Sequence, residues 1–342
     1  MRQFYIITPL VTKPAAGSSL QRQGQDRFLP RCPVCGSAVR EALAAAAPGF
    51  GVDRCLGCGL GRTRPAVPPE DIGRWYPDSY YGRENVRFNP GFEVLTRLFR
   101  RRRARFLSGR AARGPVLDVG CGRGVMLDAL RRLGYEAHGQ ELNGSAAWHA
   151  RRALGLDVAT GDFLAAALEP GYYQAVIFWH SLEHFPDPDA ALARARALLR
   201  PGGVLAVAVP NFNSLQARLF GRHWFHLDLP RHYFHFGTRS LQALLARHGF
   251  RVVRTDHFCL EQDPFGWLQS LYNAAGFPAN LLYDLLKAPS ARDGTARAHR
   301  FAGALTMIPL LPLLVLALLL TILDAALRQG GTVELYAVKA EA

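Results

Sequence analysis

Short apolar runs and amphipathic stretches alternate through the second half of the chain. Strand-type runs occur at residues 115–119, 136–140, 156–159, 175–179 and 204–209. Apolar residues recur at helical spacing between these runs, for example at 125–133 and 190–199. This alternation predicts a parallel α/β sheet whose strands are joined by right-handed crossovers.

The pattern continues towards the C-terminus with one interruption. A helix is predicted at 240–248, and strands are predicted at 250–258 and 333–339. Between the two strands, residues 301–323 form a run of 23 residues without a charge. A stretch at 264–288, rich in leucine and aromatic residues, comes before that run.

Composition limits the classes of protein to consider. A chain of 342 residues predicts one large domain with small appendages, since a domain usually takes roughly 100 to 200 residues. The 49% hydrophobic and 20% charged residues exclude extended disorder. The net charge of +14 favours anionic partners, but only three basic residues are lysines, so the arginine excess can reflect codon composition. A nucleic-acid partner is therefore not expected.

Arginines are interleaved with the apolar residues of a helix predicted at 92–107. They form either a solvated face or a patch for acidic lipid or phosphate. The aromatic segment 75–82 before this helix is either a lid or a packed linker. Residues 1–27 lack periodicity, and we expect a flexible tail there.

Four cysteines follow the pattern C-x2-C-x19-C-x2-C, which is typical of a structural zinc ribbon. The alternative is a pair of disulfides, which would require a secreted protein. The apolar run at 4–11 is too short for a secretory signal, so zinc in the cytoplasm is favoured. The predicted ligands are Cys32, Cys35, Cys55 and Cys58. Cys121 and Cys259 are expected to be free buried thiols.

A glycine-rich turn follows the first strand of the predicted sheet. Gly120, Gly122 and Gly124 let the backbone approach a ligand at the carboxyl edge, where open α/β sheets bind nucleotides. The spacing is G-x-G-x-G rather than that of the dinucleotide fingerprint, and Asp118 comes two residues before the first glycine. We therefore expect a nucleotide-type cofactor at this turn.

Acidic residues also end the next two strands. Glu141 can accept hydrogen bonds from both hydroxyls of a ribose, although it could also be an ordinary acid at a helix N-terminus. Asp162 and Phe163 place a carboxylate and an aromatic face where an adenine could bind. These residues and the glycine turn together predict a nucleoside site.

At these motifs the sequence resembles the class I S-adenosylmethionine-dependent methyltransferases. Segments 161–163, 179–188 and 199–203 also fit that family, although Tyr173 and Gln174 stand where it often has Phe-Asp. The resemblance covers 114–258 and the final strand, and it implies a Rossmann-like seven-stranded sheet with an antiparallel last strand. It implies a cofactor site made by Asp118, Gly120, Cys121, Gly122, Gly124, Glu141, Asp162, Phe163 and Trp179. The cysteine pairs look like the ribbon that precedes some bacterial sugar methyltransferases.

The cofactor that this resemblance implies leaves the protein little chemistry to do. A sulfonium methyl is already electrophilic, so catalysis consists of holding the acceptor in line and removing its proton. The candidate bases are His180, Glu183, His184, His232 and His235, of which His184 and His232 are favoured. Glu183 and His184 could instead hold a divalent cation, as in some quinone methyltransferases that this loop resembles.

The fold that the resemblance implies also constrains the apolar run. Hydropathy alone predicts a membrane span at 301–323, but the strands on either side of it must pair in one sheet. A single crossing would separate them, so the segment is expected to enter and return, with a break at Pro309 and Pro312. We expect monotopic attachment to the inner face of the membrane, through interfacial helices and the arginine cluster. The alternative is a soluble helical cap or a dimerisation surface.

The sequence thus predicts an S-adenosylmethionine-dependent methyltransferase that acts on a lipid-linked or membrane-partitioned acceptor, such as a carrier-bound sugar. A quinone or other small-molecule O-methyltransferase is the main alternative, and a non-catalytic zinc-ribbon interaction protein is another. The oligomeric state is left open. The predicted divisions are 1–27, 28–64 for the ribbon, 65–113 for a linker and basic cap, 114–262 with 330–342 for the catalytic domain, and 263–329 for the apolar insertion.

Overall fold

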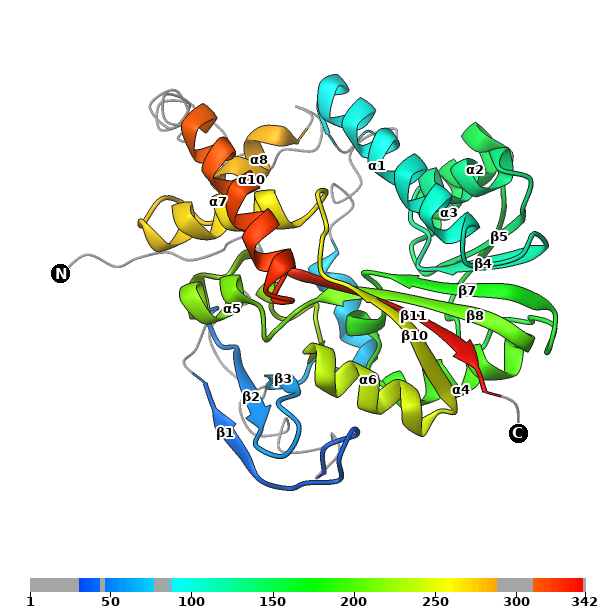
Figure 1. Ribbon diagram of the computed structural model, residues 1–342, viewed down its shortest axis with the longest axis horizontal. Coiled ribbons are helices and arrows are strands. Elements are labelled where there is room, and N and C mark those ends of the chain that lie inside the picture. The colour runs from blue at the N-terminus through cyan, green and yellow to red at the C-terminus, as the bar shows by residue number, and fades with distance from the viewer. Residues whose placement is uncertain (1–30, 44–46, 77–85, 87, 288–309, 341–342) are drawn as a thin grey trace.

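A twisted sheet of seven strands forms the centre of the molecule, with the strand order β10-β11-β8-β7-β4-β5-β6 (Figure 1). The computed structural model describes residues 31–43, 47–76, 86, 88–287 and 310–340. The strands are β4 (Pro115–Val119), β5 (Glu136–Glu141), β6 (Asp157–Thr160), β7 (Tyr173–Trp179), β8 (Leu199–Pro210), β10 (Phe250–Asp256) and β11 (Thr332–Lys339). β11 is antiparallel to both of its neighbours, and the pairs from β8 to β6 are parallel. The predicted fold class is confirmed.

Helices cover both faces of this sheet. One face carries α1 (Pro90–Ser108), α2 (Val125–Arg132) and α3 (Gly144–Leu154), and the other carries α4 (Pro188–Leu198) and α6 (Thr238–Arg247). Successive residues of β7 point to opposite faces, so Ile177 packs below α1 and α2 while Phe178 packs against α4 and α6. Both faces are apolar because both are covered, as is usual for a parallel sheet.

A second, smaller sheet contains strands that lie far apart in the sequence. Strands β1 (Arg40–Ala42), β2 (Gly51–Cys55) and β3 (Gly61–Arg64) form an antiparallel ribbon, and β9 (Phe234–His235) pairs with β3 as the fourth strand. The 3-10 helix η1 (Pro69–Trp75) leads from the ribbon towards α1. The sequence patterns did not predict the pairing of β3 with β9. The division of the chain into domains stays a prediction.

The apolar insertion forms helices α7 (Asp263–Ala274), α8 (Leu281–Leu286) and α10 (Leu310–Ala326). α10 packs on α7, where Trp267 Nε1 donates a hydrogen bond to Asp324 Oδ2 at 2.8 Å. α10 continues without a break through Pro312. Pro309 and residues 301–308 lie outside the described residues, so the break expected at Pro309 stays a prediction. Within the described ranges, no helix has the length and hydropathy that a bilayer crossing requires.

Candidate functional site

The glycine turn after β4 brings the backbone against the segment after β7. Gly120 has φ +77°, and a Cβ on it would lie 2.8 Å from Cβ of Ser181. A side chain therefore fits neither the conformation nor the space at Gly120. The amides of Gly120 and Cys121 both donate to the carbonyl oxygen of Gln140, at 2.8 and 3.2 Å, which fixes the turn beside the end of β5.

Glu141 is oriented by two backbone amides. Gly122 N donates to Glu141 Oε2 at 2.7 Å, and Asn143 N donates to Oε1 at 2.8 Å. Burial raises the pKa of this carboxyl above its usual value, while the two amides oppose that shift. Each oxygen keeps acceptor capacity after these bonds, so a fixed carboxylate at the predicted position can still receive hydroxyl donors.

Asp118 lies buried near Arg103 and Arg100, which the sequence pattern had grouped with the other arginines of α1 as a solvated face or a patch for acidic lipid or phosphate. Burial raises the pKa of Asp118 to about 7, and the positive charges of Arg103 and Arg100 oppose that rise. Both arginines form ion pairs with Glu261, and the Arg103 guanidinium lies 3.8 Å from the centre of the Trp179 ring. Arg103 follows Phe99 by four residues, so it falls on the apolar side of α1. This spacing is the signal that could have identified it as buried.

Three other predicted cofactor residues, Asp162, Phe163 and Trp179, differ in solvent exposure. Asp162 is exposed and uses Oδ1 to accept from Leu164 N at 3.0 Å. Phe163 is only 1% exposed and its ring packs edge-on against Phe178 and Phe185, so the ring belongs to the core, and its contact with an adenine stays a prediction. The sequence could not show this, because an aromatic residue after a strand can point to the core or to a ligand. Trp179 is partly buried below Arg103.

Several buried polar atoms of residues 179–183, next to this turn, have no hydrogen-bond partner among the described residues. They are Trp179 Nε1, His180 Nε2, Ser181 Oγ and both carboxylate oxygens of Glu183. Such atoms are rare in folded proteins unless a ligand, ion or water satisfies them. Together with the constricted turn at Gly120 and the oriented Glu141, they fit a bound nucleoside cofactor at this edge of the sheet.

The segment after β7 also carries the candidate bases. Its short helix η4 (Leu182–His184) holds Glu183 almost completely buried, and this burial raises the pKa of Glu183 to about 7. His180 has φ +52°, and its Nδ1 lies 3.5 Å from Glu183 Oε1. Burial lowers the pKa of His180 to about 3, so this imidazole is neutral and weakly basic.

Two groups contact Nδ1 of His184. This atom lies 3.0 Å from the carbonyl oxygen of Arg231 and 2.9 Å from the hydroxyl of Tyr76. The carbonyl oxygen can only accept a hydrogen bond, which favours the tautomer with the proton on Nδ1 and the lone pair on Nε2, while the Tyr76 hydroxyl can pair with either tautomer. Because His184 is partly exposed, Nε2 can act as the base.

The other two histidines are less suited to that role. The ring of His232 lies 4.6 Å from that of His184, centre to centre, but burial and the neighbouring His184 keep the pKa of His232 well below its usual value. His235 is 3% exposed and its Nε2 lies 3.0 Å from Thr63 Oγ1 in β3. The His235 side chain therefore contacts the ribbon, while the two favoured candidates, His184 and His232, lie together.

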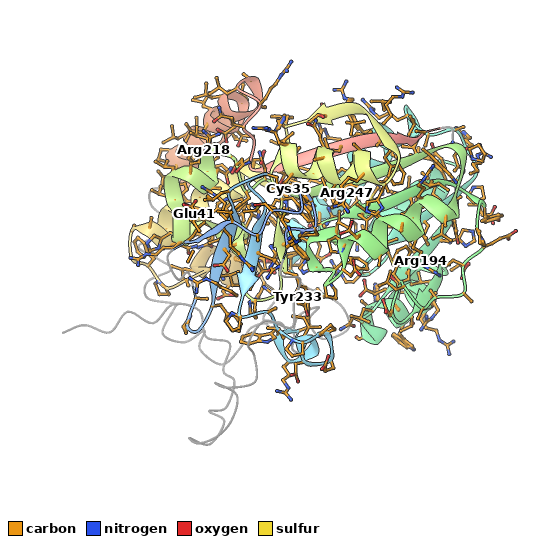
Figure 2. All side chains as sticks on the ribbon, turned by 90° about the horizontal axis from the view of Figure 1, so that it is seen from below. Cys35, Glu41, Arg194, Arg218, Tyr233 and Arg247 are labelled. Carbon is orange, nitrogen blue, oxygen red and sulfur yellow. The ribbon has the colours of Figure 1, made fainter. Side chains whose placement is uncertain are left out.

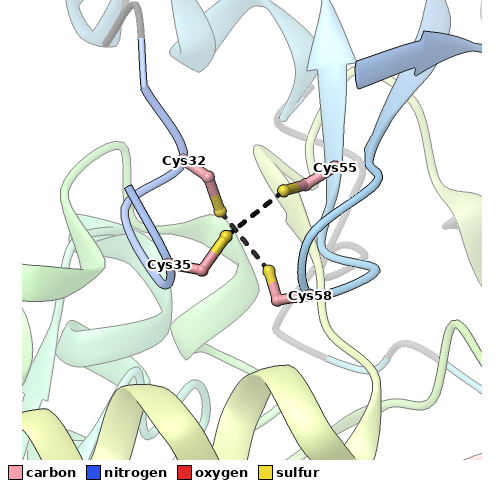
Figure 3. A group of neighbouring side chains, drawn as sticks. All are labelled: Cys32, Cys35, Cys55 and Cys58. Carbon is pink, nitrogen blue, oxygen red and sulfur yellow. Dashed lines mark hydrogen bonds between the residues drawn. The ribbon is translucent and has the colours of Figure 1, made fainter. Parts of the chain in front are cut away.

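The four predicted zinc ligands converge on one point (Figure 3). The Sγ atoms of Cys32 and Cys58 are 3.5 Å apart, and so are those of Cys35 and Cys55. A disulfide would require about 2.05 Å, whereas a tetrahedral zinc with Zn–S bonds of about 2.3 Å implies about 3.8 Å. The thiols thus fit a metal ion. Cys121 and Cys259 are buried and free, as predicted.

A second group of potential ligands lies at the candidate bases. One ligand atom each from Glu183, His184 and His232 can be chosen so that all lie within 4.8 Å of one another. The sequence had suggested only Glu183 and His184. Three protein ligands with open positions suit a divalent cation, but the same groups suit proton transfer.

A family model described as a methyltransferase domain matches residues 92–255. Curated relatives include three ubiquinone biosynthesis O-methyltransferases. That of Methylococcus capsulatus is 38% identical over 33% of this chain and 48% of its own length. That of Parvibaculum lavamentivorans is 31% identical over 46% and 68%, and that of Caulobacter vibrioides is 30% identical over 59% and 85%. The chain therefore spans about half the length of the first of these relatives and more of the others.

Solved structures with a similar chain path include a SAM-dependent methyltransferase from Archaeoglobus fulgidus. It is 20% identical, with a TM-score of 0.44 over 71% of this chain and 93% of that one. A second is a SAM-dependent methyltransferase from Thermotoga maritima, 16% identical, with a TM-score of 0.42 over 79% and 95%.

Proposed function

We propose that this chain, which belongs to the class I S-adenosylmethionine-dependent methyltransferases, methylates a phenolic hydroxyl on an apolar, membrane-partitioned acceptor of the quinone type. The observation that carries the proposal is the contact of His184 Nδ1 with the carbonyl oxygen of Arg231, which favours an unprotonated Nε2. A phenol must lose its proton during methyl transfer, so a positioned base serves an O-methyltransferase directly. The non-catalytic interpretation of the chain is not retained.

The residues that would hold the cofactor lie at the carboxyl ends of strands β4, β5 and β6. Gly120 and Gly122 provide the close approach, Glu141 provides the carboxylate for the ribose hydroxyls, and Asp118 and Asp162 provide further acids. When bound, S-adenosylmethionine supplies an electrophilic methyl group. The chain itself then has to orient the acceptor and remove one proton.

Proton removal follows from the contacts of His184. His184 N donates to the carbonyl oxygen of Ser181 at 3.1 Å, so the imidazole lies one helical turn from the residue that contacts Gly120. Nε2 takes the hydroxyl proton while Nδ1–H remains bonded to the Arg231 carbonyl. The imidazolium that forms is stabilised by the neighbouring Glu183, whose pKa the charge of His184 lowers.

The names of the curated relatives and the exposed apolar side chains of two helices support the proposed class of acceptor. The three curated relatives are named for ubiquinone biosynthesis, and nothing in the comparisons supports the carrier-bound sugar. Exposed apolar side chains on α10 and α1, the latter interleaved with exposed arginines, support contact with an anionic membrane that holds the acceptor. Both helices extend towards the same end of the molecule (Figure 1).

We also propose that Cys32, Cys35, Cys55 and Cys58 hold a structural Zn²⁺. The two knuckles and the sulfur separations support a closed four-thiolate site. A closed site offers no position for a substrate, so this metal would contribute to folding rather than to methyl transfer.

Transfer of labelled methyl from S-adenosylmethionine tests the proposal. The candidate acceptors are a catechol with a short prenyl chain and a polyprenyl-linked sugar, each in detergent micelles. We expect a labelled methyl ether of the catechol only, and its loss in the His184→Ala variant. Labelling of the sugar, or no labelling of the catechol by protein that binds the cofactor, would contradict the proposed acceptor.

A further inference from the structure

The ribbon forms one continuous sheet with β9, at the end of the loop that carries His232 and His235. Gly61 of β3 pairs with His235, and Arg62 pairs with Phe234. Thr63 N donates to the carbonyl oxygen of Tyr233 at 3.0 Å, which extends this contact by one more residue. The loop from Asp228 to His235 is thereby held on one side by a strand that lies about 170 residues earlier in the chain.

The side chain of Thr63 fixes two histidines. Its hydroxyl donates to the carbonyl oxygen of His232. A hydroxyl has one hydrogen, so towards His235 Nε2, at 3.0 Å, it can only accept. Thr63 is itself buried, and it therefore sets both the backbone position of His232 and the tautomer of His235.

The backbones of β3 and β9 lie close together. A Cβ on Gly61 would lie 2.8 Å from Cβ of His235 and 2.8 Å from the Phe212 ring. Cys55 and Leu60 belong to the same apolar core as Tyr233 and Phe234. The other knuckle is anchored on α6, where Arg247 Nη1 donates to the carbonyl oxygen of Val34 at 3.3 Å; Figure 2 shows Arg247 next to Cys35. Displacement of β3 would therefore displace β9.

The cysteine cluster lies at the hairpin that leads into β3. β2 ends at Cys55, and the hairpin to β3 closes with the bonds Gly59 N to Cys55 O (2.8 Å) and Cys55 N to Leu60 O (2.8 Å). β1 is exposed along its whole length, so it adds little apolar burial. A bound metal would therefore add most to the stability of the ribbon at its two cysteine knuckles.

We infer that the four-cysteine ribbon positions the acceptor side of the active site through β3, with Thr63 as the positioning residue for the His184–His232 pair. The inference rests on the proposed function of His184. The ring of His232 packs against that of His184, Tyr233 N donates to the carbonyl oxygen of Glu183 at 2.9 Å, and Tyr76, just after the ribbon, contacts His184 Nδ1. Metal binding at a site that touches no substrate thus controls methyl transfer.

Variants at Thr63 separate positioning from stability. Thr63→Val keeps the shape but loses the hydroxyl and its two hydrogen bonds, and Thr63→Ser keeps the hydroxyl. Thr255→Val is the control, since the same substitution in β10 removes a hydroxyl that bonds only to Gln242 among the described residues. We expect Thr63→Val to lower kcat by about 10- to 100-fold, with unchanged affinity for S-adenosylmethionine and unchanged metal content. Thr63→Ser should restore kcat, and Thr255→Val should leave it near the native value.

Hydrogen exchange gives a readout that does not depend on methyl transfer. Peptides covering 232–236 should exchange faster in Thr63→Val than in Thr63→Ser, and faster still after the metal is removed with a thiol-reactive mercurial and chelator. Peptides of β4 should not change. Native exchange at 232–236 in metal-depleted protein, or a native kcat for Thr63→Val, would overturn the inference. If no variant shows methyl transfer but exchange changes as expected, the proposed function fails and the structural coupling stands.

Discussion

The Nδ1 atom of His184 lies 3.0 Å from the backbone carbonyl oxygen of Arg231. This contact connects the segment after β7 to the loop before β9, and it favours the tautomer in which Nε2 is the basic nitrogen of the imidazole. A side chain divided equally between two tautomers would offer a base only part of the time. The favoured tautomer and the greater exposure of His184 make it a better base than the more deeply buried His232.

Replacement of His184 by alanine should remove the base. We expect kcat to fall by about 10²- to 10⁴-fold, with little change in the dissociation constant for S-adenosylmethionine. Steady-state assays and calorimetry measure the two quantities. His138→Ala is the control, because His138 in β5 pairs with Glu136 in the same strand and with Asp157 in β6, away from the site. A native kcat for His184→Ala would show that another group accepts the proton.

The buried carboxyl of Glu183 should make folding stability depend on pH. Its pKa is raised from 4.5 to about 7 by burial, so the unfolded chain releases this proton at lower pH than the folded protein does. Stability is therefore lost as pH rises from about 4.5 to 7 and then levels off, by about 3 kcal/mol at most. Urea unfolding at pH 5 and pH 8 should show Glu183→Gln more stable than the native protein at pH 8 and similar to it at pH 5. Equal effects at both pH values would contradict this assignment.

Loss of one cysteine should empty the zinc site. We expect close to one zinc per chain in the purified protein, and far less in Cys55→Ser, because three thiolates close a tetrahedral site poorly. Cys121→Ser should retain zinc, since Cys121 is buried beside α2, outside the cluster. Elemental analysis of the variants measures this directly. Zinc retained in Cys55→Ser would contradict the four-thiolate assignment.

The exposed face of α10 should bind anionic vesicles. Leu319 and Ile322 are 60% and 57% exposed, and burying both side chains in a bilayer stabilises binding by about 2 kcal/mol, or roughly thirty-fold. Leu319→Ser with Ile322→Ser should reduce co-sedimentation with phosphatidylglycerol vesicles by that factor. Val39→Ser with Val253→Ser is the control, because these residues are similarly exposed on other elements. Native protein that stays in the supernatant would contradict the membrane proposal.

The sheet could be predicted because its signal is local. β4 begins and ends at Pro115 and Val119 as expected, since a strand buried on both faces is mostly apolar, and Asp118 is the one charged residue in it. Boundaries that depend on backbone pairing were less accurate. β8 already begins at Leu199, which pairs with Tyr173, whereas the sequence suggested a helix end there. Side-chain patterns do not report which backbone groups are paired.

The contacts that complete the site are long-range, and this is why they were missed. β9 has two residues, too few to show a period, and its partner β3 comes from the ribbon. Thr63 and Arg231 carry no motif, and they act through a hydroxyl and a carbonyl oxygen. Motifs did locate Glu141 and the four cysteines, because their chemistry requires particular residue types at fixed spacing.

Binding of S-adenosylmethionine by titration calorimetry tests the central claim most directly, because it needs no acceptor. We predict one site per chain, and at least about a tenfold loss of affinity in Glu141→Ala, which corresponds to roughly 1.4 kcal/mol. Glu136→Ala, at the other end of β5, should bind like the native protein. No heat from well-folded native protein, or equal affinity in Glu141→Ala, would contradict the account.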